Sequence, residues 1–222
     1  MDNPTSEIQH LKSKIAQDLL RIGAVALRPN DPFTWASRRR SPVYCDNRLT
    51  LGYPDIRTRI ADGFTAHVAA MGRGADVIAG TATAGIPHAA LVADRLGLPM
   101  AYVRAKPKAH GKENLIEGRI APGQRVVVIE DLISTGGSSL AAAAAVRAAG
   151  ADPVAVLAIF TYGFDEAQVA FDDAGIPLVT LTDFETLIAV AVESGALTDE
   201  QVVTLRNWRE NAAAWSRVYG GA

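Results

Sequence analysis

The 222-residue sequence contains one cysteine, Cys45, which excludes an internal disulfide framework and any zinc site built on several cysteines. Its net charge of −2 gives no electrostatic argument for nucleic acid or an acidic membrane as a partner. It also lacks an apolar run of about 18 residues that could cross a membrane, and the polar stretch 1–10 lacks the apolar core of a secretory signal. We therefore expect a cytoplasmic protein in a reducing compartment, with no nucleic-acid or membrane partner.

Two well-known phosphate-binding signatures are missing from the most distinctive stretch of the chain, 126–140. A Walker A loop needs a lysine before its serine or threonine, a dinucleotide fingerprint needs the G-x-G-x-x-G spacing, and neither is present here. The stretch instead has four β-formers, Val126 to Ile129, then the carboxylates Glu130 and Asp131, and then a Ser/Thr/Gly segment. We predict a strand buried on both faces that ends before the carboxylates, a loop, and a helix over the alanine-rich run 140–149.

This order of elements suits a ribose phosphate. The N-terminus of a helix gathers unpaired N–H groups and the positive end of the helix dipole, so the loop before it suits a phosphate group. Carboxylates at the carboxyl end of a parallel strand can accept hydrogen bonds from sugar hydroxyls or hold a metal through water. The alternative is a buried strand followed by an acidic turn that binds nothing.

The stretch resembles the signature of the type I phosphoribosyltransferases. In that family the acid pair binds the ribose 2′- and 3′-hydroxyls of phosphoribosyl pyrophosphate, and the loop binds its 5′-phosphate. The resemblance implies the first role for Glu130 and Asp131. It implies the second role for the loop residues Ser134, Thr135, Gly136, Gly137 and Ser138. It also implies a Mg²⁺ cofactor bound mainly through substrate and water, with a position near Asp131 as the candidate.

A second motif lies in the N-terminal stretch 33–49, which alternates turn formers with β-formers and predicts short strands in a small hood. The N-terminal motif of orotate phosphoribosyltransferases is matched by Phe33, Thr34, Ser37, Ser41, Pro42, Tyr44 and Asp46. The resemblance implies substrate contacts from Tyr44, Cys45 and Arg48, and a guanidinium fork suits a carboxylate or a phosphate. The family usually has glycine in place of Arg38, so the turn could differ here; Arg38 to Arg40 otherwise form a solvated charge run.

A turn of small residues, 80–87, follows the short apolar strand predicted at 77–79. Small residues let a ligand come close to the backbone. In the resembled family this position is the pyrophosphate loop, which often carries a non-proline cis or otherwise strained peptide. The resemblance implies pyrophosphate contacts from Thr81, Ala82, Thr83, Ala84 and Gly85, although many relatives have a lysine where this chain has Ala84. The alternative is a tight turn between strand and helix with no ligand.

Basic side chains gather in the stretch 104–118, which has no usable apolar periodicity and contains proline and glycine. This composition is typical of a mobile loop, and a cationic loop can close over a polyanion. The stretch resembles the catalytic loop of orotate phosphoribosyltransferases, which implies catalytic roles for Arg104, Lys106, Lys108 and His110. In that family the loop reaches the active site of the partner subunit, so the resemblance implies a homodimer with shared sites. The alternative is a solvated basic loop.

The remaining pattern predicts an α/β fold. Further helices are expected over 8–22, 54–71, 165–174, 183–193 and 198–219, and further strands over 100–103, 154–160 and 178–181. The alternation of strand and helix predicts a central, mostly parallel twisted sheet flanked by helices. We expect a helix and a small hood over 1–53 and a core with C-terminal helices over 54–222, all within a single compact domain.

The motifs together imply an orotate phosphoribosyltransferase, which transfers the phosphoribosyl group of phosphoribosyl pyrophosphate to orotate in pyrimidine biosynthesis. Two alternatives stay open: a phosphoribosyltransferase for a purine or for uracil, and a non-catalytic regulator that senses phosphoribosyl pyrophosphate. Such regulators usually add a DNA-binding segment, and no helix-turn-helix extension is visible in the sequence.

One departure concerns the carboxylate of orotate. Some relatives place an arginine just after the strand that here ends at 160–163, whereas this chain has no arginine between Asp152 and Thr204. The side chain of Arg48 and the backbone N–H groups near Tyr44 to Asp46 are then the candidate partners.

Overall fold

The sheet at the centre of the molecule has six strands in the order β10-β9-β8-β5-β6-β7. The computed structural model describes residues 4–35, 37–106 and 115–221. The parallel strands are β5 (Val77–Thr81), β6 (Met100–Val103), β8 (Arg125–Ile133), β9 (Asp152–Thr161) and β10 (Leu178–Asp183). The edge strand β7 (Ile116–Gly118) pairs antiparallel with β6. The predicted α/β fold with a mostly parallel sheet is confirmed.

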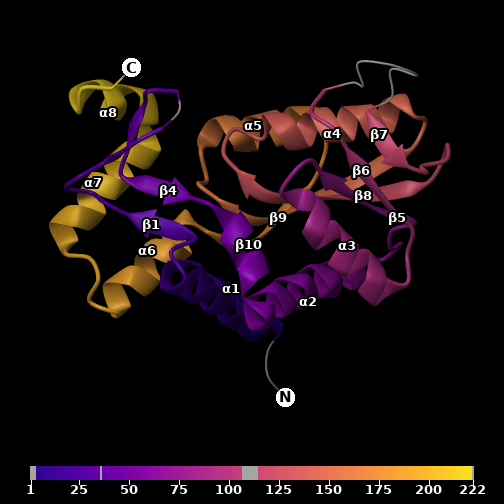
Figure 1. The fold of residues 1–222 in the computed structure, drawn as a ribbon, viewed down its shortest axis with the longest axis horizontal. Coiled ribbons are helices and arrows are strands. Elements are labelled where there is room, and N and C mark those ends of the chain that lie inside the picture. Colours follow the sequence, from indigo (N-terminus) through magenta and orange to yellow (C-terminus); the bar gives the residue numbers. More distant parts are fainter. Residues whose placement is uncertain (1–3, 36, 107–114, 222) are drawn as a thin grey trace.

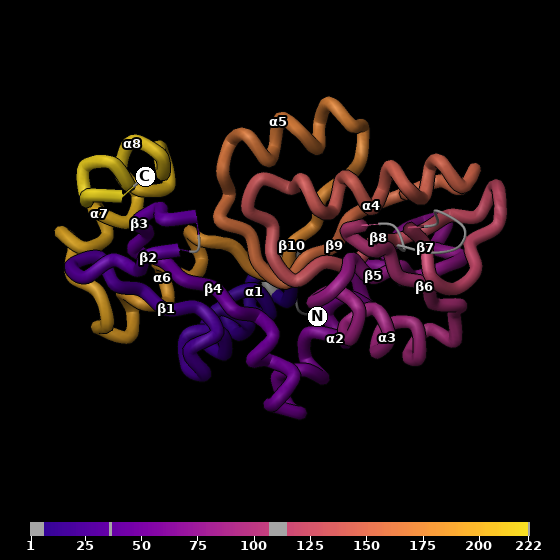
Figure 2. The backbone as a smooth tube through the Cα atoms, turned by 45° about the horizontal axis from the view of Figure 1, so that its top comes forward, coloured from indigo at the N-terminus to yellow at the C-terminus, as the bar shows by residue number. Residues whose placement is uncertain are grey.

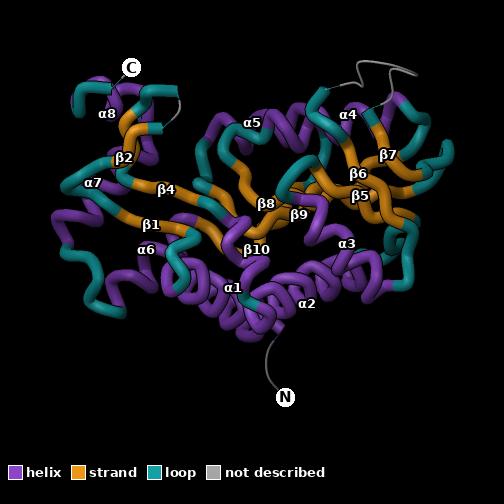
Figure 3. The backbone as a smooth tube through the Cα atoms, viewed as in Figure 1, coloured by secondary structure: helices purple, strands orange, loops and turns teal. Residues whose placement is uncertain are grey.

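Helices cover both faces of the sheet (Figure 1, Figure 3). On one side lie α2 (Pro54–Ala70) and α3 (Gly85–Leu96), with α1 (Pro4–Arg21) against β10; on the other side lie α4 (Gly137–Ala148) and α5 (Asp165–Ala174). This arrangement buries the β5, β8 and β9 strands on both faces, which explains their continuous apolar runs. None of the helices that the structure describes is long and apolar enough to cross a membrane.

The side chains of β8 alternate between these two layers. Val127 and Ile129 belong to the core on the α2 and α3 side, whereas Val126 and Val128 belong to the core on the α4 and α5 side. Successive side chains of a strand point to opposite faces, so the carboxylates of Glu130 and Asp131 point toward different helix layers. The pleat of β8 therefore separates the environments of two adjacent acidic residues.

The N-terminal hood consists of short antiparallel strands, as predicted. Strand β1 (Val25–Leu27) pairs with β4 (Val43–Cys45), and β2 (Phe33–Thr34) pairs with β3 (Arg40–Ser41). The 3₁₀ helix η1 (Asn47–Gly52) then leads into α2. The hood thus begins and ends beside the sheet and stands over its carboxyl-terminal edge.

The last helices pack against the hood and against the chain just after β9. After α6 (Phe184–Glu193), the chain forms α7 (Asp199–Glu210) and α8 (Ala212–Val218), and Figure 2 shows these yellow helices beside the indigo hood strands. The backbone N–H of Arg40 donates to Ser216 Oγ at 2.9 Å. The rings of Trp35 and Trp208 lie 6.4 Å apart, edge to face. The division into residues 1–53 and 54–222 stays a prediction.

Several element boundaries differ from the predicted ones. Strand β8 does not end at Ile129 but continues through the acid pair to Ile133, because β9 pairs with it as far as Thr161. Helix α4 begins at Gly137, three residues before the alanine-rich run, since the serines form its first turn. The stretch 116–118, expected to be part of a loop, is a strand. The helix predicted over 198–219 is broken at Asn211, whose side chain caps α8.

The β2–β3 hairpin places Arg38 in the left-handed region, with φ at +64°. The N–H of Arg38 donates to the Trp35 carbonyl at 2.8 Å, and the N–H of Trp35 donates to the Arg39 carbonyl at 2.9 Å. A hairpin closed in this way needs one left-handed residue, which is usually glycine. The turn therefore keeps the conformation that glycine favours, although this chain has arginine there.

Arg38→Gly should raise the free energy of unfolding by up to about 1 kcal/mol, because glycine adopts a positive φ without the steric cost that arginine carries. The measurement is urea unfolding of the wild type and the variant. The matched control is Arg39→Gly, which removes the same charge one residue later, where φ is not positive, and should be slightly destabilising. Equal effects of the two substitutions would contradict the conformational explanation.

Candidate active site

Glu130 and Asp131 lie near the carboxyl end of β8 in different surroundings. Glu130 is 5% exposed, and its carboxylate accepts hydrogen bonds from Ser138 Oγ at 3.0 Å and from Ser139 Oγ at 3.2 Å. It also accepts the N–H of Asp131 at 3.1 Å. These bonds tie β8 to the first turn of α4. Asp131 lies on the opposite face of the strand and is half-buried, so it is the more accessible carboxylate of the two.

Burial sets the protonation of this pair. It raises the pKa of Glu130 to about 7, and the charge of Asp131 adds to that shift. Burial also raises the pKa of Asp131. Asp131 lies close enough to the hood to raise the pKa of the Cys45 thiol, although burial is the larger cause there. Near neutral pH Glu130 is therefore partly protonated, and hydrogen-bond donors or a cation would favour its ionised form.

Glu130→Gln should make the protein more stable at pH 8 by roughly 2 kcal/mol. Because the folded pKa of Glu130 is raised to about 7 from 4.5, the native state holds more protons than the unfolded state between these values. Wild-type stability therefore falls as pH rises through this window, and glutamine removes that loss while it still accepts the serine hydrogen bonds. Urea unfolding at pH 5 and pH 8 tests this. Glu193→Gln, at an exposed position on α6, is the control, and an equal gain there would contradict the assignment.

Residues 134–138 form the connection after β8 and the first two residues of α4. The chain turns at Gly136, whose φ is +81°, and a side chain there would also meet the ring of Phe171 at 2.7 Å. The positive φ and the nearby Phe171 ring therefore both require glycine at position 136. Helix α4 has no side-chain cap at its N-terminus, which leaves its first N–H groups for a ligand. The loop brings together all the predicted phosphate-binding residues: Ser134, Thr135, Gly136, Gly137 and Ser138.

The turn between β5 and α3 lies beside this loop. A side chain at Gly85 would overlap the carbonyl oxygen of Ile129, so α3 begins in direct contact with β8. A side chain at Gly80 would come within 2.8 Å of the Ile86 Cα. The Ala82–Thr83 peptide bond is cis, as the resemblance led us to expect. The predicted pyrophosphate residues Thr81, Ala82, Thr83, Ala84 and Gly85 thus sit at the end of the strand next to β8.

The predicted catalytic loop leaves the sheet at β6 and returns at β7. Arg104 lies at its base, where its N–H donates to the Leu115 carbonyl at 2.8 Å and its guanidinium pairs with Glu117 at 3.4 Å. Lys106 is exposed. The other two predicted catalytic residues, Lys108 and His110, lie outside the described residues.

The hood contributes Tyr44, Cys45 and Arg48, but Arg48 is not free. Its guanidinium binds Asp46 twice, through Nε at 2.6 Å and Nη2 at 2.8 Å. The expectation that Arg48 is available for a substrate carboxylate is therefore weakened by its own neighbour. Sequence reasoning also missed Asn47, whose buried side chain donates to the Asp131 carbonyl at 2.7 Å and joins the hood to the acid strand.

Two neighbouring cavities open between the hood and the strand ends. One, of about 450 Å³, is lined by Thr34, Trp35, Tyr44, Cys45, Leu132, Ser134 and Tyr162. The rings of Trp35 and Tyr162 are stacked, 6.3 Å apart. We call this the aromatic cavity. Its walls suit a flat ring with polar edges.

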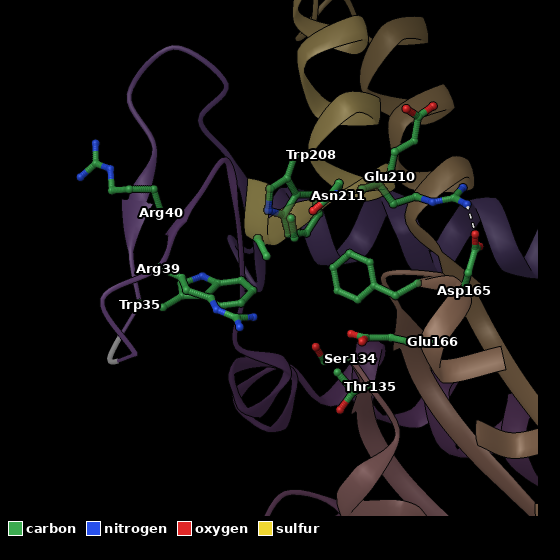
Figure 4. Close-up of a pocket in the computed structure, with 14 residues that line it drawn as sticks. Trp35, Arg39, Arg40, Ser134, Thr135, Asp165, Glu166, Trp208, Glu210 and Asn211 are labelled. Atoms are coloured by element: carbon green, nitrogen blue, oxygen red, sulfur yellow. Dashed lines mark ion pairs between the residues drawn. The ribbon is translucent and has the colours of Figure 1, made fainter. Parts of the chain in front are cut away.

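The second cavity, of about 370 Å³, shares Trp35 and Ser134 with the first. Figure 4 shows hood side chains on one side of it and Ser134, Thr135 and Glu166 on the other. Its lining includes Arg39, Arg40, Arg209, Asp165, Glu166 and Glu210. We call this the charged cavity. The two cavities therefore lie side by side, with Trp35 and Ser134 bordering both.

Comparisons with known proteins agree with this geometry. The model of the phosphoribosyl transferase domain family matches residues 55–189. An orotate phosphoribosyltransferase of Bacillus pumilus is 57% identical over 206 residues, which cover 93% of this chain and 97% of the relative. That of Bacillus subtilis is 56% identical over 203 residues, covering 91% and 94%.

Solved structures show the same fold. The crystal structure of orotate phosphoribosyltransferase from Aeropyrum pernix matches with a TM-score of 0.70 and 30% identity, covering 83% of this chain and 99% of that one. Leishmania donovani UMP synthase matches with a TM-score of 0.75 and 26% identity, covering 91% of this chain and 43% of that one.

Proposed function

Because the chain belongs to the orotate phosphoribosyltransferases, within the phosphoribosyl transferase family, we propose specific roles for its site residues in the transfer of a phosphoribosyl group to orotate. The substrates are phosphoribosyl pyrophosphate and orotate, and the reaction belongs to pyrimidine biosynthesis. One observation carries the proposed roles. Helices α3 and α4 begin after the neighbouring strands β5 and β8, and Asp131 lies near the end of β8 between them.

Phosphoribosyl pyrophosphate binds across these strand ends. Its 5′-phosphate accepts hydrogen bonds from residues 134–138 at the start of α4, and its pyrophosphate accepts them from residues 81–85 at the start of α3. Asp131 accepts hydrogen bonds from the ribose hydroxyls. Glu130 accepts hydrogen bonds from Ser138 and Ser139 and so joins β8 to the start of α4. This link fixes the distance between the ribose contact at Asp131 and the phosphate contact at residues 134–138.

Orotate binds in the aromatic cavity, between Trp35, Tyr44 and Tyr162. Its ring nitrogen is acidic enough to attack the ribose as an anion, so the site needs no strong general base. Departure of pyrophosphate leaves positive charge on the ribose and puts negative charge on the leaving group. Arg104, Lys106, Lys108 and His110 are placed by the sequence on the loop that would stabilise this leaving group.

The residues present fit a Mg²⁺ ion that is held mainly by substrate. No group of three or more metal-binding side chains occurs within the described parts of the chain, and Mg²⁺ typically takes one or two carboxylates together with substrate phosphates. Asp131 is the carboxylate that could serve, because Glu130 already accepts two serine hydroxyls. When bound, Mg²⁺ would neutralise charge on the departing pyrophosphate.

We also propose a homodimer with shared active sites in the cytoplasm. The resemblance of the basic loop supports it, and so do Leu49 and Tyr53, which are 45% and 40% exposed on the hood segment next to Arg48. In a dimer these two side chains would be covered, and exposed apolar patches are a usual site of protein contacts. Sedimentation of the protein at several concentrations tests the dimer, and a monomer at all of them would contradict it.

The test of the function is an assay of pyrophosphate release with Mg²⁺, phosphoribosyl pyrophosphate and one base at a time. Release is expected with orotate and not with uracil, adenine, guanine or xanthine. Release only with a purine or uracil would assign another base to the aromatic cavity. No release with any base, together with binding of phosphoribosyl pyrophosphate, would favour a non-catalytic sensor.

A further inference from the structure

The carboxylate of orotate needs a partner that the described side chains around the aromatic cavity do not provide. Among the residues that the structure describes, the lining of this cavity contains no cationic side chain. Arg48, next to the cavity residue Cys45, is bound twice by Asp46. No arginine lies in the segment directly after β9, since the chain has none between Asp152 and Thr204. A buried carboxylate without a cation or several hydrogen-bond donors would cost the enzyme much of its affinity.

The adjoining charged cavity does contain candidate cations, and their contacts distinguish them. Arg209 pairs with Asp165 at 3.7 Å and with Glu185 at 3.3 Å. Arg40 donates to Thr34 Oγ1 at 2.8 Å, and its backbone is held by Ser216. Arg39 is exposed, and within the described residues its guanidinium has no ion pair and no hydrogen bond.

Arg39 also lies on the β2–β3 hairpin of the hood, which borders both cavities. It follows the hairpin turn at Arg38 and lines the charged cavity together with Trp35, Ser134 and Thr135 (Figure 4). Trp35 and Ser134 also line the aromatic cavity. A pyrimidine ring in the aromatic cavity would therefore lie against the same two residues that border the cavity of Arg39.

We propose that Arg39 binds the carboxylate of orotate and makes the site select this base. The proposal rests on the proposed function of the aromatic cavity. A guanidinium can bind a carboxylate through two parallel hydrogen bonds and stays charged at every physiological pH. The charged cavity also contains carboxylates, of which Glu166 points toward Ser134 in Figure 4. Without Arg39, the cations left in this lining would be Arg209, which already pairs with Asp165 and Glu185, and Arg40, which already donates to Thr34.

Two nucleotides test this inference directly. Orotidine 5′-monophosphate and uridine 5′-monophosphate share the ribose phosphate and the pyrimidine ring, and only the first carries the carboxylate. We expect Arg39→Ala to raise KM for orotate and the inhibition constant of orotidine 5′-monophosphate by about 10- to 100-fold. The inhibition constant of uridine 5′-monophosphate and KM for phosphoribosyl pyrophosphate should stay within about twofold of the wild type.

The controls separate a binding role from a structural one. Arg38→Gly removes a neighbouring charge outside the cavity lining and should leave all these constants unchanged, whereas Arg39→Lys should recover part of the loss because it keeps the charge without the fork. Equal weakening of both nucleotides, or no weakening of orotate, by Arg39→Ala would overturn the proposal. If the wild type releases no pyrophosphate with orotate, the proposed function fails instead.

Discussion

Replacing Gly85 by alanine should lower the free energy of unfolding by roughly 3 kcal/mol and remove most of the activity. The added methyl group would overlap the carbonyl oxygen of Ile129 and lie 3.2 Å from its carbonyl carbon. Both atoms belong to the backbone of β8 in the middle of the sheet, so neither can move aside like a flexible side chain. Helix α3 must shift instead, and the 81–85 turn shifts with it away from Asp131.

Urea unfolding and KM for phosphoribosyl pyrophosphate measure the two consequences. The matched control is Gly72→Ala, because a methyl group at Gly72 meets no atom within 4 Å and the φ of Gly72 is not positive. That variant should stay within about 0.5 kcal/mol of the wild type and keep its KM. A Gly85→Ala enzyme with wild-type stability and KM would show that α3 does not need its direct contact with β8.

Asp131→Asn should reduce kcat/KM for phosphoribosyl pyrophosphate by about 100- to 1000-fold. An amide has one acceptor oxygen instead of two and no charge, so it accepts the ribose hydroxyls less well and leaves Mg²⁺ without its carboxylate. The free energy of unfolding should stay close to that of the wild type, because the hydrogen bond from Asn47 goes to the backbone carbonyl of Asp131 and not to its side chain. Loss of the neighbouring charge should also lower the pKa of Glu130 toward its ordinary value.

Steady-state kinetics and thermal unfolding test this prediction together. Asp62→Asn on α2 removes an exposed carboxylate that pairs with Arg95 and should leave kcat/KM unchanged. A loss of activity that follows a loss of folded protein would assign Asp131 a structural role. Unchanged kinetics in folded Asp131→Asn would remove the ribose contact from the mechanism.

The strand, loop and helix to which we assign phosphoribosyl pyrophosphate binding could be predicted from the sequence because they follow one another locally; the roles of their residues stay predictions. An acid pair, a Ser/Thr/Gly loop and a helix follow one another within 126–149. The error lay in the end of β8, which the sequence placed before Glu130 because acidic residues are depleted in strands. Pairing with β9 outweighs that preference, since Leu132 and Ile133 lie opposite Phe160 and Thr161.

The acceptor half could be predicted only in outline, because its parts come from distant segments. The ring of Trp208 lies 5.4 Å from that of Tyr162 and 6.4 Å from that of Trp35. Nothing in the amphipathic pattern of α7 distinguishes this contact from an ordinary core contact. Likewise, the sequence favoured Arg48 over Arg39, and only the side-chain contacts show which of these two arginines already has a partner.

The hydrogen bond between Arg40 and Ser216 joins residues that are 176 positions apart. Synthesis on the ribosome proceeds from the N-terminus, so β2 and β3 leave the exit tunnel early and remain without this support through most of translation. Strands β5, β6, β8 and β9 all precede α7 and α8 in the chain, so they can pair before these helices are synthesised. The contact that α8 makes with the β2–β3 hairpin is therefore formed late, after the central strands of the sheet.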